Sequence, residues 1–452
     1  MGTRNRLKTG LGVSAALAAL LAVTMLMRAS QNMAQTTFPL VAGDLLHLNA
    51  TAVGAIAAAG SGISVLAMVL VASRIPPRRV PIVLVGSLLM LGLAFPLVAV
   101  AHTGLVLTVG VLLLGAGGGL AFPTLITAVG GIGGEDAQPG ARDRPIALLG
   151  VALSASLAIG PFVETASLAV SGGNLRAAFL WFALGPLLAA LLMAGVVSRR
   201  SEWHRSRQAA RRRGRPGGEG HADAFRMAPE VLAVGDGIGA TAGPGPGSSR
   251  VSFRQALTDP AFQVALLGQL LYAAPFAALI VFGALFAGHD YKLSPAQIQV
   301  AFGVFFLISF AVRAGVAWRS PIRHKLAWFR LSTAVTLVGL AAIGLGHGEP
   351  QLLLAMALLG VPHGLTFPLS MALVAEDRSH AELPSVNAHL TASVQAVNLA
   401  LPLVLGLGID ALGFRTTFLL LLLPVAAAGW VQHRLGRRAG LVPLVIPAAK
   451  AR

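Results

Sequence analysis

Long apolar stretches separated by short polar connections recur along the whole chain. A hydropathy window of about 19 residues detects segments that can cross a bilayer, and a crossing needs about 20 helical residues. The pattern therefore predicts an all-α membrane protein with twelve transmembrane helices. The predicted spans are 11–38, 50–72, 80–101, 105–129, 145–170, 175–198, 262–287, 296–317, 327–346, 350–374, 386–411 and 415–433.

The composition supports this class and excludes several others. Of the 452 residues, 55% are hydrophobic and 11% are charged, against about 25% charged in an ordinary soluble domain. Cysteine is absent, which excludes disulfides, thiolate metal sites and cysteine nucleophiles. The sequence contains no His-based metal cluster, Walker loop or Gly-x-Ser-x-Gly elbow. We therefore expect no metal, no cofactor and no enzymatic activity.

Lys and Arg lie almost entirely on one side of the predicted bilayer. With the N-terminus inside, only Arg176, Lys292 and Arg415 fall outside, and only Arg28 and Arg313 fall within spans. Cytoplasmic loops of membrane proteins are enriched in basic residues, so this bias predicts that both termini are cytoplasmic. The content of Ala, Gly, Val and Arg is compatible with a GC-rich bacterium, so we expect a bacterial inner membrane.

The segment between the sixth and seventh spans divides the chain. We expect six-helix bundles at 1–198 and 261–434, a basic, Gly/Pro-rich cytoplasmic linker at 199–260 and a cytoplasmic tail at 435–452. The linker lacks a nucleic-acid-binding module and interleaved aromatics, so its basic residues predict contact with anionic inner-leaflet lipid and no nucleic-acid partner.

The second half of the chain repeats the first. At a shift of 245 residues, both halves place similar polar, Pro and Gly residues at the same points of their helices. The segments matched at this shift are Leu48-Asn49-Ala50 with Leu293-Ser294-Pro295, Arg74-Ile75-Pro76 with Arg319-Ser320-Pro321, and 115–123 with 360–368. Further along, Pro161 matches Pro402 at a shift of 241, and Arg176 matches Arg415 at a shift of 239.

Two six-helix units of the same orientation, joined by a long linker, are typical of transporters whose halves rock about a central site. In this layout the chain resembles the major facilitator superfamily. The resemblance implies two pseudo-symmetric six-helix bundles and alternating access to a cavity lined by the first and fourth helices of each half. It also implies a small-molecule substrate and an ion or substrate gradient. Since one chain holds both halves, we expect a functional monomer.

Local motifs of the family match only in part. Gly160-Pro161 resembles the Gly-Pro-x-x-Gly-Gly element of exporters, although Glu164 and Thr165 replace its later glycines. This partial match favours an exporter.

In loop 2–3, the family pattern Gly-x-x-x-Asp-x-x-Gly-Arg-Arg/Lys is reduced to Arg78 and Arg79. Arg74 stands in place of its Asp, which weakens the expectation of a conformational latch there.

Two proline positions predict helix geometry. Pro123 and Pro368 each follow a Phe in the fourth helix of a half and predict a kink, while the glycines before them predict close helix packing.

Polar residues share one face of the first predicted span. Thr24, Arg28, Asn32 and Gln35 follow one another at spacings of four, four and three residues, so they line one side of a helix. Charged residues inside a membrane usually face a cavity or a partner, which suggests that Arg28 binds substrate or an anion. The alternative is that Arg28 is held structurally by a buried carboxylate.

Glu164 is a carboxylate well inside the fifth span. Counted from the helix starts, Glu164 and Arg28 lie at comparable depth, so the two side chains are candidates for an ion pair. Glu164 is then a candidate to load and release a proton during transport. A permanent salt bridge between the first and fifth spans is the structural alternative.

Two basic residues in the second half are weaker candidates for a role in transport. His363 takes the position of Gly118 in the repeat and is a candidate to carry protons, or else a hydrogen-bonded structural residue. Arg313 lies about six residues from the cytoplasmic end of its span, close enough to reach the headgroups.

The span 386–411 carries one polar stripe. Asn387, Thr391, Gln395 and Asn398 follow at helical spacing, which predicts an inward face that lines the cavity or hydrogen bonds to other helices.

These observations favour a secondary active transporter of a small organic solute, with proton-coupled efflux as the leading hypothesis. An uptake symporter or a facilitator for an organic solute or anion is the alternative within transport. A membrane sensor or scaffold that has lost transport is the alternative from another class.

Overall fold

The computed structural model describes residues 15–76, 79–130, 143–213, 251–319, 322, 324–375 and 382–439. Within these ranges the ordered elements are all helices, which confirms the predicted all-α class. Eleven segments of the described residues are long and apolar enough to cross a membrane. The first helix is as long as the others but carries the polar face noted above, and it is the twelfth long helix.

The helices follow the predicted spans closely. The first half comprises α1 (Ala15–Leu40), α2 (Ala50–Leu66), α3 (Val80–Ala99), α4 (Gly104–Gly130), α5 (Asp143–Val170) and α6 (Leu175–Arg213). The second half comprises α7 (Phe253–Thr258), α8 (Pro260–Asp290), α9 (Pro295–Trp318), α10 (Lys325–Leu345), α11 (Glu349–Ala375), α12 (Leu383–Leu412), α13 (Phe414–Leu420) and α14 (Leu422–Arg438). Short π-helical turns extend α1 through Val41–Leu45 and α2 through Ala67–Val71.

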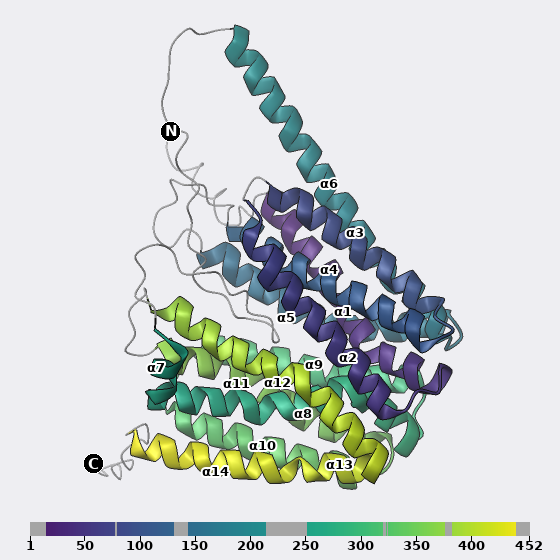
Figure 1. The fold of residues 1–452 in the computed structure, drawn as a ribbon, viewed down its shortest axis with the longest axis vertical. Coiled ribbons are helices and arrows are strands. Elements are labelled where there is room, and N and C mark those ends of the chain that lie inside the picture. Colours follow the sequence, from purple (N-terminus) through teal and green to yellow (C-terminus); the bar gives the residue numbers. More distant parts are fainter. Residues whose placement is uncertain are drawn as a thin grey trace, which may run out of the picture.

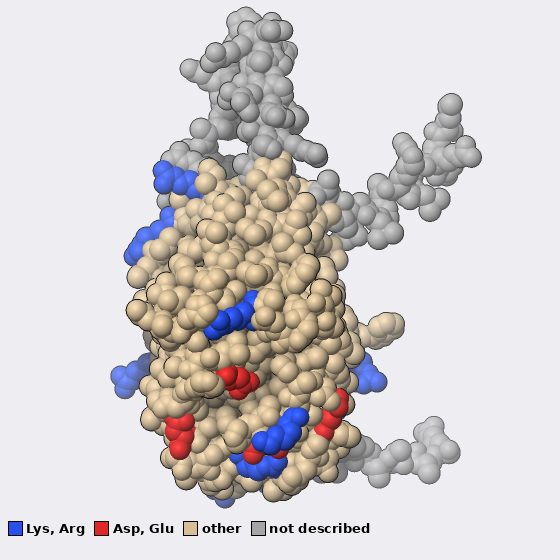
Figure 2. All heavy atoms as spheres, turned by 90° about the vertical axis from the view of Figure 1, so that its right-hand side faces the viewer, with Lys and Arg blue, Asp and Glu red and all other residues tan. Residues whose placement is uncertain are grey.

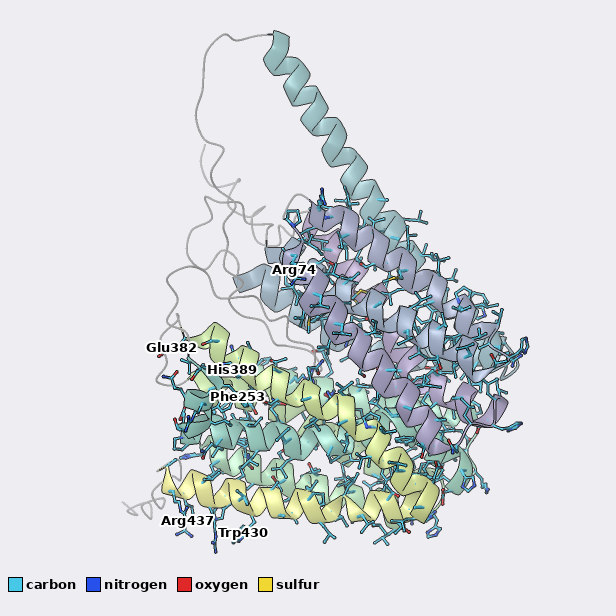
Figure 3. The ribbon with its side chains drawn as sticks, viewed as in Figure 1. Arg74, Phe253, Glu382, His389, Trp430 and Arg437 are labelled. Atoms are coloured by element: carbon cyan, nitrogen blue, oxygen red, sulfur yellow. The ribbon has the colours of Figure 1, made fainter. Side chains whose placement is uncertain are left out.

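Two segments differ from the expected linker at 199–260. The helix α6 continues to Arg213, beyond the predicted end of the sixth span, and α7 forms a further turn before α8. A capping box of Ser252 and Gln255 starts α7, because each side chain bonds to the backbone of the other residue. The ring of Phe253 lies 5.4 Å from that of His389 in α12, as Figure 3 illustrates.

The two halves repeat at the level of single hydrogen bonds. Asn49 and Ser294, matched in the sequence, each cap the N-terminus of the following helix, α2 or α9. In the first half, Arg176 donates to the carbonyl of Ala101 at 3.1 Å. In the second half, Arg415 donates to the carbonyl of Gly346 at 2.8 Å.

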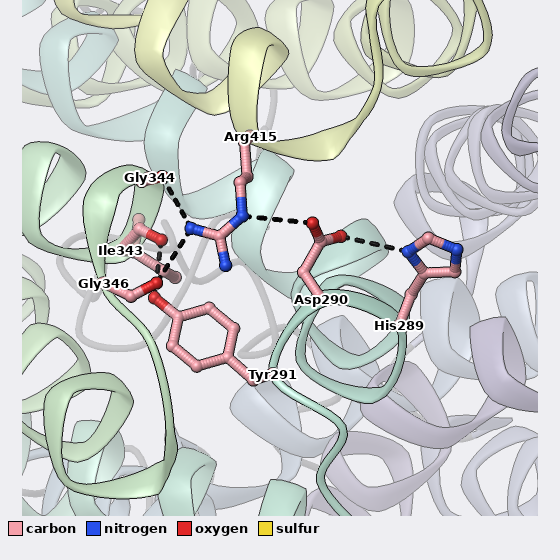
Figure 4. Close-up of polar contacts among 7 residues, drawn as sticks. All are labelled: His289, Asp290, Tyr291, Ile343, Gly344, Gly346 and Arg415. Atoms are coloured by element: carbon pink, nitrogen blue, oxygen red, sulfur yellow. Dashed lines mark hydrogen bonds and ion pairs between the residues drawn. The ribbon is translucent and has the colours of Figure 1, made fainter.

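Arg415 also pairs with Asp290 and so ties α13 to the end of α8 (Figure 4). The predicted repeat is therefore reproduced by these arginine contacts.

Close packing of the fourth helix of each half follows from its glycines. A Cβ on Gly115 would lie 2.2 Å from the Gly60 carbonyl oxygen, and one on Gly364 would lie 2.4 Å from the Ser309 carbonyl oxygen. A side chain at either position would therefore separate the helices. The predicted role of these glycines in helix packing is confirmed.

The two halves meet mainly along two seams, and α1 also packs against α8. In one seam α2 packs against α12, and in the other α5 packs against α9. We call the end of the bundle at which α7 and the start of α8 lie the linker end, and the other the opposite end. Both seams include the opposite end, where Gly406 in α12 abuts Ala50 at the start of α2. The ribbons of the two halves diverge toward the linker end (Figure 1).

Figure 2 looks onto the opposite end, where a few basic and acidic groups lie on a largely uncharged surface.

Candidate functional site

The polar face of α1 divides among three environments. Arg28 is 8% exposed, its Nη1 lies 3.4 Å from Gln31 Oε1, and its guanidinium lies 5.7 Å from the Phe122 ring centroid in α4. Asn32 is buried and donates to the Leu157 carbonyl in α5 at 3.0 Å. Gln35 is exposed. Arg28 and Gln35 therefore keep their candidacy for the pathway, whereas the amide of Asn32 joins α1 to α5.

Glu164 lies at the junction of three helices. Its side chain is fully buried in α5 and accepts hydrogen bonds from the hydroxyls of Thr36 and Thr37 in α1. The Thr36 hydroxyl also lies 3.2 Å from Oε1 of Gln299, which belongs to α9 in the other half. Glu164, Thr36, Thr37 and Gln299 form a buried set that we call the carboxylate cluster.

The candidate ion pair between Glu164 and Arg28 is not formed among the described residues. The helices α1 and α5 run in parallel, because contacts advance in the same direction along both. Asn32 contacts Leu157, and Thr36, four residues later in α1, contacts Glu164, seven residues later in α5. Arg28 precedes Thr36 by eight residues, which places it about 12 Å away along the helix axis. Counting residues from the start of each helix does not account for this axial offset between α1 and α5. Among the described residues, the Glu164 carboxylate contacts hydroxyls and no basic side chain.

Only two donors, both hydroxyls, are directed at the Glu164 carboxylate among the described residues. Thr36 and Thr37 each hold one hydroxyl proton, and both hydroxyls also lie within 3.0 Å of the Met33 carbonyl. The Gln299 amide is 0% exposed, and its Nε2 has no hydrogen-bond partner. If Glu164 carries a proton, it becomes a donor, and the hydroxyls are free to bond to Met33. The protonated form therefore satisfies more of the cluster than the charged form.

His363 lies in a cage of aromatic rings within the second half. It is 1% exposed, and its Nδ1 lies 2.6 Å from the Ser309 hydroxyl in α9. The ring of Phe276 in α8 stacks on it at a centroid distance of 4.7 Å, and Phe305 lies 5.0 Å away. This environment matches the structural alternative for His363, a histidine that joins α8, α9 and α11.

Arg313 also contacts this region. Its Nη2 donates to the carbonyl of His363 at 3.2 Å, so the side chain bridges α9 and α11. The sequence had suggested that it reaches the headgroups, but the guanidinium is directed to the backbone of the neighbouring helix.

The polar stripe of α12 is half-buried at all four positions. Asn398 donates to Gln395 at 3.3 Å within the stripe, and the Oδ1 atoms of Asn387 and Asn398 have no hydrogen-bond partner in the part of the chain that the structure describes. The stripe leads to Pro402, whose carbonyl meets Gly54 of the other half. Like the carboxylate cluster, the stripe therefore leads to a seam between the halves.

The motif positions act mainly in packing. A Cβ on Gly160 would lie 3.1 Å from the Ala29 carbonyl oxygen, so Gly160 lets α5 approach α1. Pro161, Pro123 and Pro368 all lie inside helices, as predicted.

Of the two arginines retained in loop 2–3, Arg79 is exposed, whereas Arg78 lies outside the described residues.

Sequence reasoning missed three members of the carboxylate cluster and one further acidic residue. The adjacent Thr36-Thr37 pair, two turns after Arg28, was a usable signal. Gln299 carried no signal, because its role depends on contact with the other half. Asp410 carries little signal in the sequence, because it lies next to the end of a predicted span, where charged residues are common.

Comparison with known proteins now adds to this geometry. A family profile described as Major Facilitator Superfamily matches residues 20–377 and 265–439. The chain belongs to the major facilitator superfamily. No curated protein sequence matches it significantly. Membership indicates a multi-pass membrane protein that transports a solute rather than an enzyme.

Solved structures share the fold of this superfamily member at low sequence identity. A point mutant of the nucleoside transporter NupG has a TM-score of 0.68 and 11% identity, covering 93% of this chain and 99% of that chain. A bacterial homologue of the human lysosomal transporter Spinster, inward-facing and unoccupied, has a TM-score of 0.66 and 13% identity, covering 96% and 98%. The human organic anion transporter MFSD10 (TETRAN) has a TM-score of 0.58 and 16% identity, covering 92% and 98%. These similarities confirm the major facilitator fold.

Proposed function

We propose that this protein is a secondary active transporter that couples proton movement to the efflux of a small organic solute. The observation that carries the proposal is the carboxylate cluster. A fully buried carboxylate with no basic partner among the described residues lies at a seam between halves, beside an amide from the other half. When the halves separate, that carboxylate gains access to water.

Glu164 then takes up a proton from the exterior as the opposite end closes and gives it up toward the cytoplasm before that end opens again. A buried charge is costly in free energy, and the carboxylate receives hydrogen bonds from two hydroxyls alone among the described residues, so the closed seam favours the neutral acid. Water stabilises the carboxylate once the seam opens. Coupling follows because the opening of the α5–α9 seam and the charge of Glu164 depend on each other.

Substrate contacts in this proposal come from α1 and α12. Arg28 and Gln35 supply a cation and an amide, and the stripe from Asn387 to Asn398 supplies amides and hydroxyls. The opposite end faces the cell exterior, the linker end faces the cytoplasm of a bacterium, and the monomer is the functional unit. The basic segment 199–260 contacts anionic lipid, and the bundles extend over 1–198 and 261–434.

The second candidate is an uptake symporter or facilitator. Arg74 occupies the place of the loop 2–3 acidic residue, so the chain departs there from the family pattern. Deleting the gene distinguishes the directions, because cells that lose an exporter become more sensitive to a toxic substrate and cells that lose an importer become more resistant.

Proton flux in proteoliposomes tests the coupling. We expect an imposed pH gradient to drive solute-dependent proton movement that Glu164→Gln reduces by at least about tenfold, since removal of a buried proton carrier leaves only uncoupled exchange. Glu349→Gln is the matched control, because Glu349 lies at the start of α11 and contacts Gln297 within the second half. Solute exchange without proton flux in the wild type would support a facilitator. No solute flux in the wild type, with a cellular function that survives Glu164→Gln and Arg28→Ala but is lost on deletion of the linker, would support a sensor.

A further inference from the structure

A second acidic side chain joins the two halves at the α2–α12 seam. Asp410, near the end of α12, accepts hydrogen bonds from the backbone N–H groups of Ala50 and Thr51, both at 2.9 Å. These groups belong to the first turn of α2, where backbone N–H groups have no partner within the helix. The carboxylate also faces the positive end of the α2 dipole.

The contact depends on the register of the two helices. A Cβ on Gly406 would lie 2.4 Å from the Ala50 carbonyl oxygen, and one on Gly54 would lie 2.2 Å from the Pro402 carbonyl oxygen. The two helices therefore touch backbone to backbone one and two turns before Asp410 in α12, on one side of the hydrogen bonds. Asn49 already caps Ala52, so Asp410 completes the first turn from across the seam.

The repeat has no counterpart to this contact. Pro295 occupies the position of Ala50 in the second half, and proline has no N–H to donate. Ser294 and Gln297 instead form a capping box within the start of α9. The loop 2–3 acidic residue is also missing, since Arg74 stands there. Among the described residues, the chain thus caps a helix across the seam on one side only.

We propose that Asp410 is a positioning residue for transport, which holds the opposite end closed by capping α2 and must release it in each cycle. This inference rests on alternating access as the proposed function. It adds a residue outside the polar pathway that sets the balance between the conformations. Loss of Asp410 favours the conformation open at the opposite end.

The absence of cysteine allows the balance to be measured directly, because introduced cysteines are the only spin-label sites. One pair, Leu105→Cys with Leu345→Cys, reports the distance between the halves at the opposite end, where both residues are exposed. The other pair, Arg74→Cys with Arg437→Cys, reports the linker end (Figure 3). Distances are measured by double electron–electron resonance on the full chain in lipid nanodiscs.

In Asp410→Ala we expect the population open at the opposite end to rise about fivefold relative to the closed one, the change that loss of a helix cap produces. The Leu105/Leu345 distance lengthens and the Arg74/Arg437 distance shortens. Asp410→Asn, which keeps one oxygen acceptor, gives an intermediate shift. Unchanged distances in Asp410→Ala overturn the proposal.

Two further variants guard against misfolding and general effects. Ala50→Pro removes one donor from the other side of the seam and copies the second half, because proline is accepted at the first helical position. It shifts the distances in the same direction as Asp410→Ala. Asp290→Ala breaks an ion pair at the same end but within the second half, so its distances stay as in the wild type. An equal shift in Asp290→Ala overturns the proposal.

Because these distances are measured without solute or a proton gradient, they separate this inference from the proposed function. If the distances shift as expected but no protons are transported, the role of Asp410 stands and the proposed proton coupling is wrong. If protons are coupled to transport but the distances are unchanged in Asp410→Ala, the proposed function stands and the role of Asp410 is wrong.

Discussion

The two seams between the halves are formed by different kinds of contact. In the α2–α12 seam, backbone meets backbone at Gly54 and Gly406, and a solvent-exposed carboxylate caps a helix. In the α5–α9 seam, side chains meet: the ring of Phe162 lies over Gly303, and a fully buried Glu164 lies near Gln299.

The difference teaches how the repeat can serve two tasks. Backbone contact leaves no room for adjustment, so the α2–α12 seam is either in register or open. Side-chain contact with a titratable group adjusts to a proton. We infer that the first seam sets the geometry of the closed state and the second makes that state depend on protonation.

The largest effect is expected when a side chain is added where the backbones of α2 and α12 touch. In Gly54→Leu, even the Cβ overlaps the Pro402 carbonyl oxygen, so we expect the closed state to be lost and transport to fall at least about a hundredfold, roughly 3 kcal/mol. Transport assays and the Leu105/Leu345 distance check both effects.

The matched control for this change is Gly86→Ala. A Cβ at Gly86 in α3 meets nothing within 4 Å, so transport should stay near the wild-type rate. Normal transport in Gly54→Leu would show that the seam is not needed for the cycle.

A smaller effect of opposite sign is expected in the side-chain seam. Gln299 is buried with an unsatisfied Nε2, and such a group costs about 1–3 kcal/mol. Gln299→Met keeps the length of the side chain and removes the unsatisfied donor, so we expect a higher melting temperature together with slower transport. Thermal unfolding in detergent measures the first and solute flux the second.

Gln432 provides the control, because its amide is buried too but donates to the Val264 carbonyl at 2.8 Å. Gln432→Met should lower the melting temperature, since it leaves that carbonyl without this donor. If both variants lower the melting temperature equally, the amide of Gln299 is satisfied in solution and our account of the seam is wrong.

Much of the fold was readable from the sequence because its signals are local. Hydropathy located the helices, and the match of Asn49 with Ser294 and of Arg176 with Arg415 located the repeat. The extension of α6 to Arg213 was missed because a hydropathy window ends where the apolar residues end, whereas a helix does not.

The site was less readable because it depends on how helices are staggered. Arg28 and Glu164 seemed equally deep when counted from helix starts, but the bonds of Asn32 and Thr36 set a different register between α1 and α5. Gln299 gains its importance from Thr36, which lies 263 residues away in the chain, and periodicity does not detect such a contact.

The smallest effect is expected at the end of α1, where Asp44 faces His289 of the second half. Asp44 is exposed on one side, but its partial burial raises its pKa above the usual value, and the nearby His289 and His47 partly offset this. Because the folded protein disfavours the charged form, stability is highest when Asp44 is protonated and is lost as the pH rises through the raised pKa. Asp44→Asn should therefore raise the melting temperature slightly at pH 7 and leave it unchanged below about pH 4, near the ordinary carboxyl pKa. Melting curves from about pH 4 to 8 measure the difference, and an offset that stays constant over that range would mean that Asp44 is as well solvated in the folded protein as in the unfolded chain.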